Sequence, residues 1–581
     1  MSITQRLIDR GVISEEQLAV AEESRKAPGD RLDLVLIRMG LAAETDVLSA
    51  MSEELHIPLV DLTACEIDVD VLRAMPGKLV HRQRLVPIRK LPGQLEAPAN
   101  GSRTLTVATA DPYDVYAFDE LRMLTGRKVE PVLAPARDID DVIKRYYGVG
   151  SETLSELVGD DVEIVTDKHV DEGDEEAQAQ QASVVKLVND IMKEAVASRA
   201  SDVHIEPYER DLRIRYRIDG VLQLANIPPT IRQFQNAIIS RIKILSKLNI
   251  AEKRLPQDGG FKMKYEGRDI DVRVSVIPMV HGEGVVLRIL DKSRVNLRLD
   301  TVGMPPQIQQ TFNTLINNPH GIVLVTGPTG SGKTTTLYAA LNTIVNDELK
   351  ILTVEDPVEY KLDGINQVET LGRIGLDFAR ALRSFLRHDP DVILVGEIRD
   401  KETATVAIEA SLTGHLVFST LHTNDACSAT TRLLDMGIEP FLVTSTIEGV
   451  LAQRLIRTIC PDCRTFYEPQ RADTDLNGQP VYLDHLGKPL PPDLGFKPGD
   501  KLAYGAGCRS CRGIGFSGRK GIFELLVMTE ALRELVMQRS GASKLIEQAR
   551  KEGMRFLRDD GWDRVRAGQT TVEEVARVAA V

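Results

Sequence analysis

A glycine-rich segment near the middle of the chain constrains the fold more than any other feature. It reads G-P-T-G-S-G-K-T from Gly327 to Thr334 and follows the apolar run Ile322–Val325. Glycines at this spacing let backbone N–H groups turn inward around a phosphate chain, and the start of the following helix adds a favourable dipole. The alternative is a glycine-rich turn that binds nothing, which the strand before it and the helix after it disfavour.

Two side chains of this loop have specific expected roles. Lys333 reaches the terminal phosphates of a nucleotide, and the hydroxyl of Thr334 can hold Mg²⁺. The sequence therefore predicts that the chain binds ATP together with magnesium. The candidate phosphate-binding residues are Gly327, Pro328, Thr329, Gly330, Ser331, Gly332, Lys333, Thr334 and Thr335.

Continuous apolar runs alternate with helical stretches beyond about residue 300. Such alternation indicates an α/β domain in which helices cover both faces of a parallel sheet. The runs are Ile322–Val325, Ile351–Val354, Val392–Val395 and Leu416–Phe418.

Acidic residues follow two of these runs, where we expect the sheet edge that faces the phosphates. Glu397 comes directly after the run Val392–Val395 and one glycine, as in a Walker B strand, so we expect it on the metal and water side. Glu355 directly follows the run Ile351–Val354, and Glu359 comes four residues later. Either is a candidate general base. For any one of these acids, the alternative is a solvated loop carboxylate.

Two histidines bracket the run Leu416–Phe418. His415 precedes the run and His422 follows it. A lone histidine is usually structural. We nevertheless expect this strand to neighbour the Walker B strand, so the hypothesis is that His415 and His422 help to sense the γ-phosphate.

The first 150 residues contain a short internal repeat and then a different pattern. The segment Leu7–Leu18 is echoed by Leu36–Leu48, and each copy has a glycine suited to a helix C-terminus, then a polar N-cap candidate and a new apolar helix face. Between residues 79 and 147, short β-rich runs such as Leu105–Thr109 alternate with helical stretches such as Val115–Thr125. We expect small helical hairpins followed by a small α/β domain.

Residues 151–181 separate this region from the rest of the chain. They carry eleven Asp or Glu against one Lys, which predicts a mobile linker without a core. Beyond them, Val184–Met192 has one apolar helical face and Leu212–Gly220 alternates as a strand into a turn, so a second α+β domain begins there. The expected divisions are 1–150, 151–181, 182–298 and 299–581, the last with a finger at 458–515.

Size and charge limit the classes of function. A chain of 581 residues needs several domains, because single cores stop growing at roughly 250 to 300 residues. The net charge of −13 disfavours nucleic acid as a partner. No apolar run approaches the roughly 18 residues that span a bilayer, and the N-terminus lacks the apolar core of a signal peptide. We expect a cytoplasmic protein.

Four of the six cysteines form two close pairs. Cys460 and Cys463 make one C-x-x-C motif, and Cys508 and Cys511 make the other. Four thiolates suit tetrahedral Zn²⁺, and a site with no open position is structural. The alternative is a redox dithiol or unrelated free thiols.

Taken together, the motifs resemble the secretion ATPases of the type II and type IV pilus class, a branch of the RecA-like P-loop motors. The resemblance covers nearly the whole chain after residue 180. It rests on the Walker A segment Gly327–Thr334, the aspartate box Ile351–Glu359, the Walker B segment Asp391–Asp400, the histidine box Gly414–Asn424, and the segments Ala200–Pro207 and Arg254–Gly259. The implied fold is a RecA-like domain preceded by a PAS-like α+β domain and an N-terminal docking domain.

This resemblance also implies partners and further site residues. In the family the active particle is a homohexamer, and arginines matching Arg273 and Arg288 close on the nucleotide. The implied partners are the cytoplasmic domain of the type II inner-membrane protein, general secretion protein L, and the inner-membrane platform protein. These would attach the chain peripherally to the inner membrane. Cyclic di-GMP is not expected as a ligand, because Arg31-Leu32-Asp33 has Asp where the related module usually has Gly.

The resemblance favours one function and leaves others open. A tetracysteine finger is similar to those of type II secretion and pilus assembly ATPases and is absent from retraction ATPases. The leading hypothesis is an ATP-hydrolysing motor of type II secretion that powers pseudopilus assembly, and the alternative is a type IV pilus assembly ATPase. A nucleotide-sensing regulator without turnover is a hypothesis from another class, which the intact acids disfavour.

Overall fold

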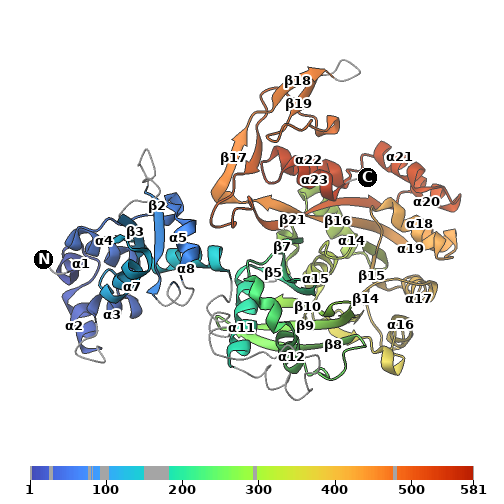
Figure 1. Ribbon diagram of the computed structural model, residues 1–581. Coiled ribbons are helices and arrows are strands. Elements are labelled where there is room, and N and C mark those ends of the chain that lie inside the picture. Colours follow the sequence, from blue (N-terminus) through green and yellow to red (C-terminus); the bar gives the residue numbers. More distant parts are fainter. Residues whose placement is uncertain are drawn as a thin grey trace. The chain divides into compact units, whose positions relative to one another are not determined.

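The computed structural model describes residues 3–24, 31–75, 80, 83–91, 104–148, 182–291, 297–474 and 480–579. The chain divides into two compact units, one ending at Asp291 and the other beginning at Lys292 (Figure 1). The acidic linker predicted at 151–181 lies outside the described residues. No helix in the described part of the chain is long and apolar enough to cross a bilayer.

The first unit begins with four short helices that carry the internal repeat. Gly11 and Gly40 have φ of 68° and 69°, so each copy has its expected left-handed glycine. Ser14 caps the second helix and exchanges hydrogen bonds with Gln17, whereas the cap in the second copy is Ala43, which has no side-chain oxygen. The polar cap was therefore predicted correctly for the first copy only. The helices are α1 (Ile3–Asp9), α2 (Glu15–Glu23), α3 (Leu32–Arg38) and α4 (Glu44–Leu55).

A small mixed sheet follows, in the order β1-β2-β3-β4. β3 and β4 are parallel and are joined by α7, which matches the helical stretch predicted at Val115–Thr125. The small α/β region predicted from the sequence is confirmed. Its elements are β1 (Glu66–Ile67), α5 (Val69–Ala74), β2 (Val86–Lys90), β3 (Thr104–Thr109), α7 (Val115–Thr125), β4 (Lys128–Leu133) and α8 (Ala136–Tyr147).

A six-stranded antiparallel sheet forms the remainder of the first unit, in the order β7-β6-β5-β10-β9-β8. Asp219 and Gly220 have φ of 48° and 84° and make the two-residue turn between β6 and β7 that the sequence predicts. The elements are α11 (Ala182–Ala197), β5 (Ala200–Pro207), β6 (Leu212–Ile218), β7 (Val221–Leu224), α12 (Gln235–Leu245), β8 (Gln257–Tyr265), β9 (Arg268–Met279) and β10 (Gly282–Asp291).

The second unit is built on a seven-stranded sheet in the order β13-β12-β14-β15-β11-β16-β21. All neighbours are parallel except β21, which pairs antiparallel with β16. The four predicted apolar runs are all strands of this sheet. Its strands are β11 (Gly321–Thr326), β12 (Ile351–Glu355), β13 (Asn366–Glu369), β14 (Val392–Val395), β15 (Leu416–Leu421), β16 (Ile447–Ile459) and β21 (Phe516–Val527).

Both faces of this sheet are buried under helices, as predicted. Ile322 and Leu324 of β11 belong to one hydrophobic cluster, while Val323 and Val325 belong to another on the opposite face. One face carries α14 and α15, and the other carries α16 to α19. These helices are α14 (Pro306–Ile316), α15 (Lys333–Ile344), α16 (Phe378–Phe385), α17 (Lys401–Leu412), α18 (Cys427–Asp435) and α19 (Pro440–Thr446), with the short α13 (Leu299–Val302) before them.

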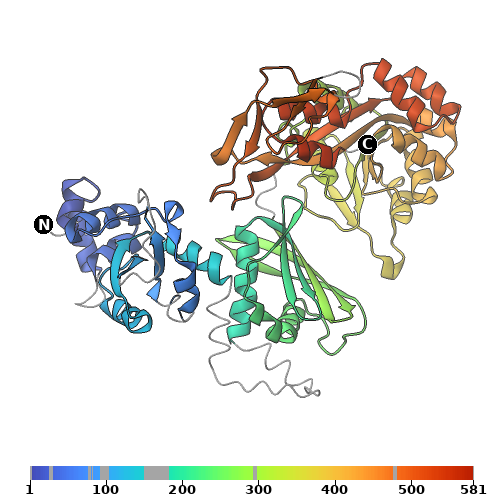
Figure 2. The same ribbon diagram turned by 45° about the horizontal axis from the view of Figure 1, so that its top comes forward.

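The finger is inserted between β16 and β21, and four helices follow it. Of these last helices, drawn in red in Figure 2, α22 contacts β21 and α23 contacts β16, whereas α20 contacts α19 and α21 contacts α18. Residues 475–479, between β18 and β19, lie outside the described residues. The elements are β17 (Arg464–Tyr467), β18 (Gln470–Thr474), β19 (Pro480–Leu483), β20 (Leu502–Gly505), α20 (Glu530–Met537), α21 (Ala542–Lys551), α22 (Leu557–Arg566) and α23 (Val572–Val578).

Candidate functional site

One edge of the second unit's sheet gathers most of the predicted site residues. The parallel strands β12, β14, β15 and β11 are neighbours, so their carboxyl ends meet at the same edge. There, β12 ends at Glu355, Glu397 follows β14, His422 follows β15, and β11 leads into the glycine-rich loop. The topology therefore joins four chain segments that are distant in sequence.

The glycine-rich loop packs closely against Gln453 of β16. A Cβ at Gly327 would lie 2.5 Å from the carbonyl oxygen of Gln453, and a Cβ at Gly332 would lie 2.8 Å from its Nε2. Gly332 is also the N-cap of α15, with φ of 91°. Glycine is required at both positions because a side chain has no space and, at Gly332, the backbone is left-handed.

The ammonium group of Lys333 is held inside the loop. Its Nζ donates hydrogen bonds to the carbonyls of Gly327 and Pro328, at 2.8 and 3.2 Å. An ammonium has three protons, so one remains for a phosphate oxygen. Burial lowers the pKa of Lys333, and the negative charge of Glu397 opposes that shift. The influence of Glu397 on Lys333 indicates that the acid and the loop share one electrostatic environment.

The remaining hydroxyl groups of the loop differ in direction. Thr334 is exposed at the start of α15, as a ligand for magnesium must be. Thr336 is buried and donates to Oε1 of Gln453 at 2.6 Å. Ser331 is 3% exposed, and its Oγ has no hydrogen-bond partner among the described residues. The residues present therefore fit a nucleotide with Mg²⁺ at Thr334.

Glu397 is a largely buried carboxylate with two basic neighbours. It forms an ion pair with Arg399, and Nε2 of His422 lies 2.9 Å from its Oε2. Burial raises the pKa of Glu397, but the hydrogen bonds from Arg399 and His422 outweigh it and leave the pKa below its usual value. Glu397 is therefore ionised at neutral pH, as a residue on the metal and water side must be.

Glu355 is fixed by three donors at the end of β12. Its carboxylate accepts hydrogen bonds from the Tyr338 hydroxyl, from Thr353 Oγ1 at 2.6 Å and from Gln367 Nε2 at 3.1 Å. Burial, and then the adjacent Glu355 carboxylate, raise the pKa of Tyr338 well above its usual range. Glu359 lies half-buried on the loop beyond the strand. Both candidate bases thus lie at the end of β12 or just beyond it.

His415 is not brought to this site. It precedes β15, and its Nδ1 lies 2.7 Å from the carbonyl oxygen of Ala410 and 3.1 Å from Oγ1 of Thr413. Two residues that bracket a strand lie at opposite edges of the sheet, and six residues of strand separate those edges by about 20 Å. The structure therefore places only His422 beside the acid, and His415 stabilises the turn before β15.

Arg273 and Arg288 belong to the first unit. They face each other in register on β9 and β10. The Nε of Arg288 donates to Oδ1 of Asp202 at 3.1 Å, while its side chain is 55% exposed. A half-exposed guanidinium leaves donors for a second anion. The role of both arginines at the nucleotide stays a prediction.

Two residues of β16 take part in the site although the sequence did not single them out. Gln453 contacts the loop as described above, and Arg454 lies beside Gly327, where a Cβ would be 3.2 Å from its Nη1. The sequence feature that could have identified them is this pair of polar residues within the otherwise apolar run Val450–Ile456. A buried strand accepts a charged residue only where that residue has a partner or a task.

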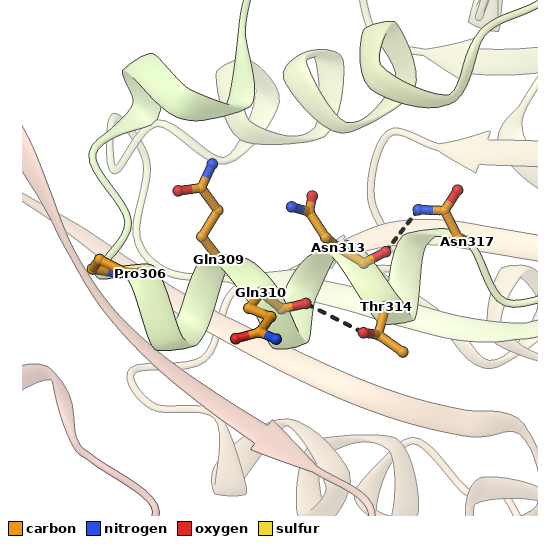
Figure 3. A pocket seen from close by; sticks show the side chains of 6 residues that line it. All are labelled: Pro306, Gln309, Gln310, Asn313, Thr314 and Asn317. Carbon is orange, nitrogen blue, oxygen red and sulfur yellow. Dashed lines mark hydrogen bonds between the residues drawn. The ribbon is translucent and has the colours of Figure 1, made fainter.

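A pocket shown in Figure 3 lies on α14 rather than at the phosphate loop. Within it, Asn317 Nδ2 donates to the carbonyl of Asn313 at 2.7 Å, and Thr314 donates to the carbonyl of Gln310. Its lining carries amides and hydroxyls but no titratable side chain, so it offers no acid–base group. The lining residues are Pro306, Gln309, Gln310, Asn313, Thr314 and Asn317.

The four paired cysteines meet at the base of the finger. Sγ of Cys460 lies 3.8 Å from that of Cys508, and Sγ of Cys511 lies 3.7 Å from those of Cys463 and Cys508. Four thiolates at about 2.3 Å from a tetrahedral Zn²⁺ are separated by about 3.8 Å, so the spacing fits zinc. The backbone N–H of Gly515 also donates to Cys511 Sγ, at 3.2 Å.

Glu524 of β21 links the site to the C-terminal helices. Its two carboxylate oxygens accept from the backbone N–H of Ala426 at 2.7 Å and of Leu557 at 2.9 Å. Ala426 is the N-cap of α18, which follows the histidine box, and Leu557 begins α22. One buried carboxylate therefore satisfies the N-terminal ends of two helices.

Burial makes Glu524 a source of pH-dependent stability. Burial raises its pKa from 4.5 to about 7. Because the folded pKa is the higher one, the folded state binds more protons between these values, and stability is lost as the pH rises through this window. The shift corresponds to about 3 kcal/mol. Glutamine does not titrate, so the melting temperature of wild type minus that of Glu524→Gln should fall between pH 5 and pH 8.

The control for this comparison is Glu534→Gln, which changes an exposed acid on α20. The difference in melting temperature between wild type and Glu534→Gln should stay constant over the same pH range. A wild-type minus Glu524→Gln difference that is independent of pH would contradict the assignment.

Comparison with known proteins identifies the family. A family model described as Type II/IV secretion system protein matches residues 177–577, and one described as MshEN domain matches residues 55–153. The first match includes the glycine-rich loop, the acids and the four cysteines.

Three relatives show the extent of the similarity. The type IV pilus assembly ATPase PilB of Myxococcus xanthus is 43% identical over 575 residues, covering 98% of this chain and 97% of that protein. The type II secretion system protein E of Xanthomonas campestris is 41% identical over 590 residues, covering 99% and 98%. The type II secretion system ATPase E of Vibrio cholerae is 50% identical over 402 residues, covering 68% and 75%. The motifs, the fold and these matches agree, and the chain belongs to the type II/IV secretion system protein family.

Proposed function

We propose that this chain hydrolyses ATP and converts the reaction into mechanical work for protein secretion. The observation that carries the proposal is the meeting of Lys333 and the ionised Glu397 at one sheet edge. A buried ammonium with one uncommitted proton can bind an oxygen of a phosphate chain. An ionised carboxylate after β14, which β15 separates from β11, suits a position beside the metal ion and the attacking water. A site that only bound nucleotide would need no carboxylate to orient an attacking water.

The roles of the residues follow from their positions. Lys333 and the loop N–H groups hold the phosphates, and Thr334 would hold Mg²⁺, which neutralises charge on the phosphate oxygens. Glu397, fixed by His422, orients the attacking water, and Glu355 or Glu359 accepts its proton. The direct contact between His422 and Glu397 supports the proposal that His422 senses the γ-phosphate.

Phosphate release from ATP by the purified full-length chain tests the proposal. Wild type should release phosphate steadily with Mg²⁺, and Lys333→Ala should lower the rate by about two orders of magnitude, because the cation that neutralises the phosphates is lost. Lys350→Ala, which removes an exposed lysine of the same unit, is the control. Binding of ATP by wild type without any release would favour a nucleotide-sensing regulator instead.

The cellular function proposed is the motor of type II secretion, powering pseudopilus assembly at the inner membrane. The full-length similarity to the Xanthomonas campestris protein and the higher identity to the Vibrio cholerae protein support it. The alternative is pilus assembly, which the Myxococcus xanthus relative supports over the same length of chain. Both functions use the same ATP site, so the protein that binds this chain must distinguish type II secretion from pilus assembly.

The proposed assembly is a cytoplasmic homohexamer attached peripherally to the inner membrane. In this arrangement Arg273 and Arg288 close on the nucleotide, and zinc is held by the four cysteines. Binding should be measured to the cytoplasmic domain of general secretion protein L and to pilus platform proteins. Binding only to the pilus proteins would replace type II secretion with pilus assembly while leaving the ATPase proposal intact.

A further inference from the structure

Arg454 occupies an unusual place for a charged residue. It lies in β16, whose Ala452 pairs in register with Thr326, the last residue of β11. Arg454 therefore stands beside the first turn of the phosphate loop. It is only 8% exposed.

The two terminal nitrogens of Arg454 have different surroundings. Nη2 donates to the backbone oxygen of Asn424 at 2.8 Å and to its Oδ1 at 3.1 Å. Nη1 faces Gly327 and has no hydrogen-bond partner in the part of the chain that the structure describes. One half of the guanidinium thus holds the histidine box, while the other half points at the phosphate loop.

The charge of Arg454 is balanced only at a distance. Burial lowers its pKa, and the charges of Glu524 and Asp425 oppose that shift, yet no ion pair joins Arg454 to an acid among the described residues. Arginine keeps its proton under such conditions. A buried cation without a direct counterion is costly, which argues that it serves the site.

The segment that Arg454 holds contacts Glu397, the acid that follows the Walker B strand. The hydroxyl of Thr326 accepts from the backbone N–H of Thr423 at 3.0 Å, so the segment is tied to β11 as well. One residue earlier, His422 contacts Glu397. Arg454, which faces Gly327, is therefore linked through Asn424 and the adjoining backbone to His422 and Glu397.

We propose that Arg454 is a positioning residue that couples the phosphate loop to the His422–Asn424 segment and so holds Glu397 in its working geometry. The inference rests on the proposed ATPase function and deepens it. Arg454 acts through Asn424 and His422. Its loss should therefore affect turnover more than nucleotide binding.

A double-mutant cycle on the full-length chain tests this coupling. Arg454→Gln and Asn424→Ala should each lower kcat about tenfold and leave the KM for ATP within about threefold. The double variant should fall no further than Arg454→Gln, because the Oδ1 contact that Asn424→Ala removes is already lost with the guanidinium. Arg454→Lys keeps the charge but not the two terminal nitrogens of the planar guanidinium, and should recover about threefold over Arg454→Gln.

Melting temperatures and a matched control separate this role from simple loss of structure. Arg539→Gln removes an exposed arginine of the same unit and should leave kcat unchanged. Should Arg454→Gln fail to fold, Arg454→Lys and Asn424→Ala carry the same cycle.

Two outcomes would overturn the inference while the ATPase proposal stands. One is wild-type turnover in Arg454→Gln, and the other is an additive loss of about a hundredfold in the double variant. By contrast, wild-type protein that releases no phosphate would overturn the proposed function itself.

Discussion

Replacing Glu397 with glutamine should lower phosphate release by about three orders of magnitude while ATP still binds. The structure gives the reason. Glu397 is ionised because Arg399 and His422 hold its carboxylate, and glutamine keeps the shape of the side chain without its charge. The neutral amide oxygen is a weaker acceptor for the water than a carboxylate, and it carries no charge to balance the magnesium ion. Single-turnover phosphate release measures the rate, and a fluorescent nucleotide measures binding.

The matched control is Glu402→Gln. Glu402 lies five residues further along the chain, is 62% exposed and pairs with Arg383. Its loss should change neither rate nor binding. Release by Glu397→Gln within about fivefold of wild type would mean that Glu397 is not on the reaction side of the nucleotide.

Cys463→Ser should remove zinc from the protein and release the finger. The four sulfur atoms converge at the spacing of a tetrahedral site, and a structural zinc supplies folding energy that three thiolates do not replace. Wild type should contain about one zinc per chain and the variant close to none. Limited proteolysis should then cut between Arg464 and Gly505, a region that should resist cleavage in the zinc-loaded wild type.

Cys65→Ala is the control for this experiment, because Cys65 is half-buried in the first unit. It should retain zinc and resist proteolysis like wild type. A Cys463→Ser protein with full zinc content would show that another group completes the site, and a protected finger without zinc would show that its strands fold unaided.

Much of this site was predictable because its signals are local. Strands that are buried on both faces read as continuous apolar runs, and each run found from Ile322 onward is a strand. The loop and the cysteine pairs are equally local, since backbone geometry and metal coordination fix the spacing of Gly327, Gly332, Cys460 and Cys463.

The features that were missed depend on where segments meet in space. His415 was grouped with His422 because both flank one strand, but a strand has two ends and only one lies beside Glu397. Arg454 was overlooked because its partner, Asn424, is thirty residues away in sequence. Likewise, two of the three donors around Glu355, Tyr338 and Gln367, come from other segments, which no local pattern reveals.

The strand β16 gives the finger a mechanical connection to the site. Arg454 beside the phosphate loop and Cys460 at the zinc site are separated only by strand residues and lie on one stretch of backbone. β21 runs back along the same stretch, from Ile459 opposite Phe516 to Gly449 opposite Val527. A two-stranded ribbon resists bending in its plane, so a tilt imposed at one end is delivered to the other. The finger is therefore anchored, through an unbroken length of paired strand, to the same strand that borders the glycine-rich loop.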